Sequence, residues 1–517
     1  MRIRKDSTHK HRAVQMAVVT VLDALSCLPW HWVDTQGILV FLSILLLTKY
    51  IYQLPAKDLP PGPFPLPLIG NMLNVGFKDP INSMNQHVET YGDVSRVNMG
   101  AVSCVLLSGY ECFKEAFVQK ADAFTDRPPY PLNDKLCKGL GLISSNGHMW
   151  KQQRRFALST LKYFGVGKKT LENSILEESG LLCNALQSER GMPIDPQCLL
   201  TNAVANIVCT LVFGHRFEYD NKHFHQMLKC STDIFQLPVT NWGRMYNEFP
   251  RLMNFLPGKH QRAFSSNEEL KRFIRDEVKR HQEDRNPSNP RDYIDCYLEE
   301  IEKNKDEAAG FNEENLIYCI VDLFGAGTET TSNTLRWAML YMAKYPEVQE
   351  KVQAEIDRVI GQSRQPTMAD RANMPYTDAV THEIQRFGNI VPFTPPRISN
   401  RDTTLSGFRV AKGMMVFPML RPILRDKGEY SNPDQFHPEH FLDKNGKFLK
   451  REAFIPFSIG KRKCPGEPLA RMELFLFFTS LLQRFSFLPP TGKELTFKYE
   501  IGITCGPKPF EICAVTR

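Results

Sequence analysis

The stretch Phe457-Ser458-Ile459-Gly460-Lys461-Arg462-Lys463-Cys464-Pro465-Gly466-Glu467 places one cysteine between an extended segment and a strongly apolar run. That run, 469–482, is long enough for a buried helix. A cysteine directly before a helix lies at the positive end of the helix dipole, near backbone N–H groups that lack partners, and both features favour the thiolate. Three cationic residues precede the cysteine. The stretch is therefore typical of a metal-ligand loop.

The spacing around Cys464 is more specific than a lone cysteine, which is otherwise a small buried hydrophobe. The pattern Phe-x-x-Gly-x-Arg-x-Cys-x-Gly resembles the haem-binding loop of the cytochromes P450. The resemblance implies haem b with an axial thiolate from Cys464, and places Phe457 and Arg462 beside the cofactor. In that family the thiolate donates electrons that favour O–O cleavage on the opposite face of the haem.

Composition agrees with one large intracellular body. The chain has 517 residues and no low-complexity stretch or repeat after residue 60. Its thirteen cysteines are scattered and odd in number, which indicates reduced thiols and a cytosol-facing body. The net charge of +7 is mild and spread widely, so we expect no nucleic-acid partner but a membrane surface or an acidic protein.

The N-terminal segment is predicted to be a membrane anchor, residues 1–58. A basic head, 1–12, precedes two apolar stretches, 13–32 and 35–52, and the second is the better span. A buried core helix is the structural alternative, and no small-residue cleavage site supports a signal peptide. The basic head favours the cytosol, so one span and a hairpin of two spans both stay open.

A proline-rich hinge is predicted at 59–71, because its closely spaced prolines cannot form a helix and hold an extended spacer. The same hinge follows the anchor of microsomal cytochromes P450. The resemblance therefore implies a catalytic domain at 72–517 that faces the cytosol at the endoplasmic reticulum membrane.

A long helix is expected from Asn312 to Lys344, about 50 Å in length, and such a length implies a central element. Its middle, 324–331, contains glycines and β-branched residues that weaken a helix, so a local widening is expected there. The segment resembles the family's oxygen-activation motif. The resemblance implies that Ala326 borders the haem and that Thr330 and Glu329 serve hydrogen bonding and proton relay. A glycine kink used for helix packing is the alternative.

Other donors are spaced for the carboxylates of a cofactor. Trp150 and Arg154 lie at i and i+4 and share one helical face. In the family this pair contacts a haem propionate, and Arg397 is the expected second donor; an ordinary amphipathic helix is the alternative for the pair. Ile390, Val391 and Thr394, which precede Arg397, are the candidates to face substrate.

Glu383 and Arg386 form an i, i+3 pair that, alone, is typical of a surface ion pair. In the family this Glu-x-x-Arg pair is buried and structural. Most members have arginine where His440 stands, and the charge of a histidine there depends on pH.

Three further segments complete the expected architecture. Residues 93–108 and 403–417 are predicted to form strands. Residues 242–258 are an irregular apolar stretch, by resemblance a membrane-dipping loop beside the substrate channel, with core packing as the alternative. A helix is expected from Asn267. The expected fold is mainly α with small β-sheets, with a long central helix over the haem.

Whole motifs indicate the subfamily. The segments 402–407, 451–462 and 335–343 resemble those of the vertebrate microsomal second family, and within it the J-type arachidonate epoxygenases. The resemblance implies a membrane-bound monooxygenase that epoxidises or hydroxylates polyunsaturated fatty acids. A xenobiotic, drug or steroid monooxygenase is the main alternative. A haem-thiolate isomerase would not need the Glu329 and Thr330 pair, and a non-enzymatic haem-binding protein would leave it without purpose.

Electrons are expected from outside the chain, because no nicotinamide or flavin fingerprint is present. The resemblance implies NADPH-cytochrome P450 reductase as the partner and O2 as co-substrate, with a b-type cytochrome as a second donor. A docking face of Lys151, Arg155, Lys461 and Lys463 suits an acidic partner.

Overall fold

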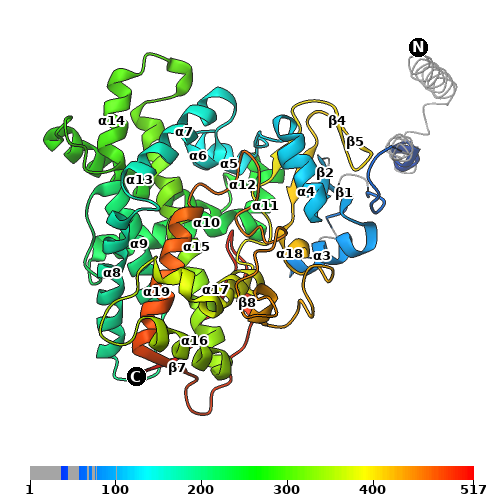
Figure 1. Ribbon diagram of the computed structural model, residues 1–517. Coiled ribbons are helices and arrows are strands. Elements are labelled where there is room, and N and C mark those ends of the chain that lie inside the picture. The colour runs from blue at the N-terminus through cyan, green and yellow to red at the C-terminus, as the bar shows by residue number, and fades with distance from the viewer. Residues whose placement is uncertain (1–36, 45–57, 67–68, 73–75, 77–78, 101) are drawn as a thin grey trace. The chain divides into compact units, whose positions relative to one another are not determined.

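The computed structural model describes residues 37–44, 58–66, 69–72, 76, 79–100 and 102–517 (Figure 1). Contacts divide the chain into one unit of Met1–Leu59 with Leu66–Leu68, and a second of Pro60–Pro65 with Ile69–Arg517. Residues 37–44 are helical and their apolar side chains are exposed. Most of the predicted anchor lies outside the described residues. Within those that are described, no helix has the length and apolar character needed to cross a membrane.

The second unit is mainly helical with small sheets, which confirms the predicted fold class. Its α-helices are α3 Pro80–Tyr91, α4 Tyr110–Lys114, α5 Pro131–Cys137, α6 Gly141–Ser144, α7 Gly147–Tyr163, α8 Lys169–Ser188, α9 Gln197–Phe213, α10 Lys222–Gln236, α11 Asn241–Glu248, α12 Pro250–Met253, α13 Lys259–Asp284, α14 Tyr293–Lys303, α15 Glu313–Lys344, α16 Pro346–Val359, α17 Pro375–Gly388, α18 Leu420–Leu424 and α19 Glu467–Arg484. Its strands are β1 Val94–Met99, β2 Val102–Leu107, β3 Arg397–Ile398, β4 Thr403–Leu405, β5 Phe408–Val410, β6 Met415–Pro418, β7 Phe485–Leu488, β8 Tyr499–Glu500, β9 Gly506–Pro507 and β10 Cys513–Thr516.

The largest sheet among the described residues has four strands in the order β1-β2-β6-β3. Strands β1 and β2 form the predicted antiparallel hairpin, with Val94 opposite Leu107. Strand β6 lies parallel to β2, and β3 is antiparallel to β6, which pairs Arg397 with Val416. The sheet thus places β2, near residue 105, beside β6, near residue 416. The β4–β5 hairpin confirms the strands predicted at 403–417.

Helix α15 is the central element, as predicted. The Asn312 side chain caps it by accepting the N–H of Asn315 at 2.9 Å, and Pro346 follows its end. Its 32 residues span about 48 Å. It packs against α9, α13 and α17 and against α19, which lies beside it in Figure 1.

The glycines of α15 serve helix packing. The helix is continuous through 324–331. A Cβ on Gly325 would lie 2.1 Å from the ring of Phe235, and one on Gly327 would lie 2.8 Å from Val208. These positions therefore lack side chains because α9 and α10 pack closely against them.

Helix α19 begins at Glu467, after Gly466 as N-cap, and Pro468 rather than Pro465 lies in its first turn. It is buried on nearly all sides and shares a core cluster with α8, α15 and α16. The helix expected directly after Cys464 is therefore present, although it starts three residues past the cysteine.

Two boundaries differ from expectation. Helix α13 begins at Lys259 rather than Asn267, because buried His260 and Ala263 extend its apolar stripe upstream through polar sequence. The stretch predicted to be irregular, 242–258, contains α11 and α12. The hydroxyl of Thr240 caps α11 by accepting the N–H of Gly243 at 3.2 Å.

Candidate active site

Cys464 lies at the end of a tight loop. Its N–H donates to the carbonyl of Phe457 at 3.0 Å, and the loop turns through Ser458 and Gly460, with φ of 60° and 80°. A Cβ on Gly460 would lie 2.0 Å from the carbonyl oxygen of Phe117. The glycine therefore allows the loop to pack against the chain at Phe117.

The thiol of Cys464 is in a mixed environment. The residue is exposed, yet the surrounding protein is dense enough that burial raises the pKa of the thiol above its ordinary value. Backbone N–H groups of Gly466 and Glu467, and the charge of Arg154, act in the opposite direction. The N–H groups before the helix thus favour the thiolate, as predicted, but burial outweighs them in the protein alone. Metal binding requires the deprotonated thiolate.

The cations beside Cys464 point in different directions. Lys461 pairs with Asp122, and Lys463 pairs with Glu467 at 2.6 Å. These two lysines are exposed and face solvent. The charges of both lysines are therefore paired with carboxylates.

Arg462 turns inward and stacks on Trp150, with its guanidinium carbon 3.9 Å from the ring centroid. Its nitrogens donate to backbone carbonyls, among them those of Thr125 at 3.0 Å and Ser145 at 2.5 Å. Burial lowers the pKa of Arg462 to about 9, and the nearby charge of Arg397 acts in the same direction. The indole Nε1 of Trp150 is buried and lacks a hydrogen-bond partner in the described structure.

Arg154 and Arg397 lie in the same region. Arg154 donates to the carbonyl of Lys463, which joins α7 to the cysteine loop. Arg397 is 2% exposed, its Nη1 lacks a partner, and burial lowers its pKa to about 9. Within the described residues, neither these two arginines nor Arg462 forms an ion pair with a carboxylate. Such a donor set fits an external dianion.

Two residues that sequence reasoning missed support this group. Arg127 donates to the carbonyls of Ile143 at 3.0 Å and Pro395 at 2.6 Å. Asp322 of α15 accepts the N–H groups of Leu142 and Ile143, and burial raises its pKa to about 7. Asp322 thereby fixes the segment 142–145, whose carbonyl groups accept hydrogen bonds from Arg462. Neither residue belongs to a short-range pattern, so no local signal identifies them.

Thr330 and Ala326 lie on the same turn of α15. The Thr330 hydroxyl donates to the carbonyl of Ala326 at 2.7 Å, which is the i−4 bond common for helical threonines. The next residue, Thr331, donates to Glu473 of α19 at 3.0 Å. Glu473 is fully buried, and burial raises its pKa to about 8. This bond ties the helix of the threonine motif to the helix that follows Cys464.

Glu329 faces a polar cavity of about 70 Å³ together with Thr504, Asn333 and Arg336. Burial raises the pKa of Glu329 to about 7, while the Thr504 hydroxyl, which donates to it at 3.4 Å, acts in the opposite direction. Asn333 donates in turn to Thr504 at 3.0 Å. A carboxyl that titrates near neutral pH beside a polar cavity is suited to proton transfer.

The candidate substrate residues lie on the extended segment after α17. Ile390 and Val391 are half-buried, and Thr394 is buried with a hydroxyl that lacks a partner in the described structure. The N–H of Thr394 donates to Pro418 at 3.0 Å, and the carbonyl of Ile390 accepts from Cys505 at 2.6 Å. The segment is thus held between β6 and the chain before β9.

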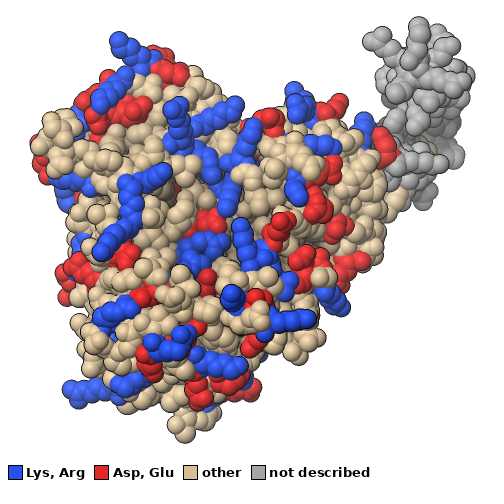
Figure 2. All heavy atoms as spheres, viewed as in Figure 1, with Lys and Arg blue, Asp and Glu red and all other residues tan. Residues whose placement is uncertain are grey.

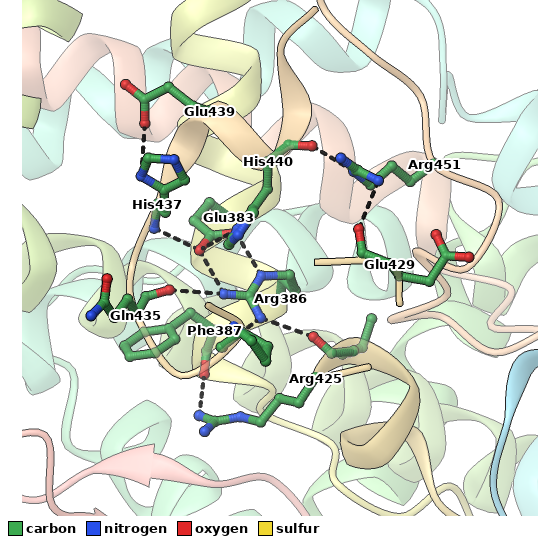
Figure 3. A network of polar contacts seen from close by, with 12 residues as sticks. Glu383, Arg386, Phe387, Arg425, Glu429, Gln435, His437, Glu439, His440 and Arg451 are labelled. Carbon is green, nitrogen blue, oxygen red and sulfur yellow. Dashed lines mark hydrogen bonds and ion pairs between the residues drawn. The ribbon is translucent and has the colours of Figure 1, made fainter. Parts of the chain in front are cut away.

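Glu383 and Arg386 form the centre of a buried network (Figure 3). Both side chains are fully buried and meet through two bonds of 2.7 Å. Arg386 also donates to the carbonyls of Leu424, Pro433 and Gln435, at 2.9 to 3.0 Å. The pair is therefore internal, unlike the surface ion pair that its spacing alone predicts.

His440 completes this network at the position where most of the family has arginine. Its Nδ1 lies 3.3 Å from both carboxylate oxygens of Glu383, and its Nε2 contacts the carbonyl of Ser431. Arg451 donates to the His440 carbonyl at 2.5 Å (Figure 3). Histidine thus keeps the contact to Glu383, and Arg451 adds a second tie to the same segment.

Comparison with known proteins identifies the class. The profile of the family "Cytochrome P450" matches residues 60–514, and the chain belongs to that family. It is 46% identical over 502 residues to human Cytochrome P450 2J2, covering 97% of this chain and 100% of the relative. It is 48% identical over 481 residues to rat Cytochrome P450 2J3, covering 93% and 96%. Rat Cytochrome P450 2C23 is 46% identical over 487 residues, covering 93% and 99%.

Membership defines the chemistry. The chain is a haem-thiolate monooxygenase of the second P450 family, which uses haem with a cysteine thiolate and O2. The residues present fit that cofactor, because one region holds the loop cysteine, buried guanidiniums without carboxylate partners and an unpartnered indole N–H. When bound, haem supplies the oxidising chemistry and its two propionates supply the negative charge.

Proposed function

We propose that this protein inserts one oxygen atom of O2 into polyunsaturated fatty acids such as arachidonate, chiefly by epoxidation. The balanced reaction converts an alkene, O2, NADPH and a proton to an epoxide, NADP⁺ and water. The observation that carries the proposal is the near full-length match to 2J relatives, together with the J-type motifs at 402–407, 451–462 and 335–343. The catalytic domain is assigned to 72–517, with the hinge at 59–71 and the anchor at 1–58.

Cys464 would supply the thiolate that holds the haem iron, with Phe457 in its loop. Trp150, Arg154, Arg397 and Arg462 are assigned to the propionate side. The unpartnered Nε1 of Trp150 and Nη1 of Arg397 support this assignment, because buried donors in a folded protein normally have acceptors. Arg462, whose nitrogens already donate to carbonyls, acts mainly through its charge and its stacking on Trp150.

Glu329 is assigned to proton transfer. Thr330, on the face of α15 beside Ala326, is assigned to hydrogen bonding. The carboxyl of Glu329 accepts a proton from the polar side of the helix, where the cavity lies, and its near-neutral pKa allows both uptake and release. Thr330 can exchange its bond to Ala326 for a bond to a substrate oxygen by rotation about χ1. Ile390, Val391 and Thr394 are assigned to the substrate side.

A flavoprotein reductase that oxidises NADPH is the proposed electron donor, with a b-type cytochrome as an accessory donor. Lys151, Arg155, Lys461 and Lys463 are all exposed, and two of them surround the thiolate loop. Figure 2 shows basic and acidic side chains interspersed over one face of the protein.

The membrane of the endoplasmic reticulum is the proposed location. An apolar surface on α11, α12 and the turn that follows supports it, because large hydrophobic side chains there are exposed: Trp242, Met245, Phe249, Leu252, Phe255 and Leu256. Phe255 is 87% exposed. Such a patch is costly in water and suits a lipid surface from which a fatty acid reaches the protein.

The test is turnover by the full-length holoprotein, reconstituted with NADPH-cytochrome P450 reductase in phospholipid vesicles. We expect NADPH-dependent epoxides of arachidonate, resolved by chromatography and mass spectrometry. A xenobiotic set and a steroid set serve as parallel substrates, since the match to a 2C relative keeps these alternatives in view. Efficient turnover of either set without arachidonate products would contradict the fatty-acid assignment.

A further inference from the structure

A second cavity, of about 130 Å³, lies between the end of α17, α18 and β8. Its walls are largely aromatic, with Trp337, Tyr341, Phe387 and Phe497. Arg421 and Arg425 also line it, and its described lining contains no aspartate or glutamate. An aromatic cavity with two guanidiniums and no carboxylate is suited to an anion with an apolar body.

The cavity offers donors that have no internal acceptor. Asn389 is 7% exposed, and its Nδ2 lacks a partner in the described structure. Arg425 uses Nη1 for Asp434 at 2.5 Å, whereas its Nε is buried and unpartnered. Burial lowers the pKa of Arg425, and the charge of Arg421 lowers it further. A bound anion would relieve this repulsion and satisfy the free donors.

Arg421 interacts with the Tyr499 side chain and keeps further N–H groups for such a ligand. It forms no ion pair among the described residues, and its guanidinium lies 6.0 Å from the ring centroid of Tyr499. The Tyr499 hydroxyl donates to Asp79 at 3.4 Å.

We propose that this cavity binds a small organic carboxylate with a compact aromatic body, of the benzoate class. The carboxylate accepts from Arg421, from Nε of Arg425 and from Nδ2 of Asn389, while the aromatic walls enclose the ring. An apolar cavity of about 150 Å³ holds one benzene, so the smaller volume here admits no more than a single ring within its walls, leaves the carboxylate beside the arginines and excludes a long-chain fatty acid. The site is therefore separate in ligand class from the proposed fatty-acid substrate.

The cavity adjoins the segment assigned to substrate. Asn389 has a left-handed backbone, with φ of 36°, and directly precedes Ile390. The carbonyl of Ile390 accepts the N–H of Cys505, which also lines the cavity. A bound carboxylate therefore stabilises the backbone of residues 389–390 from the side of this cavity. This consequence, unlike the binding itself, rests on the proposed function of Ile390.

The experiment titrates 4-fluorobenzoate into full-length holoprotein by ¹⁹F NMR, with a haem-coordinating azole at saturation so that the haem side is blocked. We expect saturable binding that weakens at least about tenfold in Arg421→Gln, because a charge-assisted bond is lost. Asn389→Asp, which keeps the backbone preference and adds a negative charge, should weaken binding by a similar factor or more. Arg272→Gln, an exposed arginine on α13, is the matched control.

Neutral 4-fluorobenzamide separates charge from shape, and we expect it to bind about tenfold more weakly than the carboxylate. Equal binding of amide and carboxylate, or unchanged binding in both site variants, would overturn the proposal in favour of an apolar hollow. No saturable binding would overturn it in favour of a cavity that holds only water. The azole spectrum of each variant checks that it is folded, and none of these results depends on arachidonate turnover.

Discussion

Two buried groups of arginines in this protein have opposite surroundings. In the network around Glu383, Arg386 is fully buried and has a carboxylate at 2.7 Å and three carbonyl partners. Around Trp150, buried Arg397 and Arg462 have no carboxylate partner in the described structure. A buried charge is tolerated only when it is compensated. The first group is thus complete within the chain, and the second is complete only with an anion such as the haem propionates.

The largest effect should come from breaking the complete group. Glu383→Ala leaves Arg386 buried without its counter-charge, which costs about 3–5 kcal/mol. We expect loss of the folded protein or a denaturation midpoint far below that of the parent. Glu429→Ala is the control and should change little, because Glu429 meets this network through its backbone carbonyl, which accepts from Arg451 at 2.7 Å. Equal stability of Glu383→Ala and the parent would show that the pair is not structural.

Glu329 is a buried carboxyl that, unlike Glu383, faces a polar cavity and forms no ion pair with an arginine among the described residues. Glu329→Gln keeps the size and the bond to Thr504 but cannot carry a proton. We expect product formation to fall about a hundredfold, with NADPH consumption diverted to hydrogen peroxide. The limb of the pH profile near pH 7 should disappear as well, since the pKa of Glu329 lies at about 7. An unchanged ratio of product to NADPH would exclude Glu329 from proton delivery.

Glu473 is the acidic counterpart of the buried arginines without a carboxylate: it is a buried carboxyl that forms no ion pair among the described residues. Its pKa is raised to about 8, so the folded state holds a proton that the unfolded state loses above its ordinary pKa. Stability should therefore fall as pH rises from about 5 to 8, by about 1.4 kcal/mol per pH unit. Glu473→Gln keeps an oxygen that accepts from the Thr331 hydroxyl and should flatten this slope. The check is chemical denaturation at pH 5.5 and 7.5; identical slopes would contradict a neutral Glu473.

The incomplete group should respond in the opposite direction to the first. Arg397→Met removes an uncompensated charge, so we expect the protein without haem to be as stable as the parent or more stable. The holoprotein should lose haem to apomyoglobin about tenfold faster, because a charge-assisted bond is absent. Arg272→Met is the surface control. Destabilisation of the haem-free protein, with unchanged haem loss, would indicate a purely structural arginine.

The sequence predicted those features that depend on residues close together in the chain. The Cys464 loop, the start of the long helix near Asn312 and the strands at 93–108 each have a short-range pattern, and the structure contains all three. Side-chain packing between distant segments could not be predicted from such short patterns. Gly325, Gly327 and Gly460 are contact points for Phe235, Val208 and Phe117, and no local sequence pattern shows these contacts.

Long-range pairs were also out of reach. The support for Arg462 comes from chain more than 300 residues earlier, including Thr125 and Ser145, and from Asp322 through the segment 141–145. The direction of Lys461 and Lys463 depends on Asp122 and Glu467, which turn both lysines outward. A pattern of residue types fixes neither a distant partner nor the direction of a long side chain.

The most direct measurement is the difference spectrum of the reduced holoprotein with carbon monoxide, beside Cys464→Ser. The account predicts a Soret band shifted strongly to the red of imidazole-ligated haem in the parent, and its loss in the variant. Cys505→Ser, a buried cysteine away from the loop, should keep the band. Absence of haem, or a band that survives Cys464→Ser, would contradict the assignment of the thiolate.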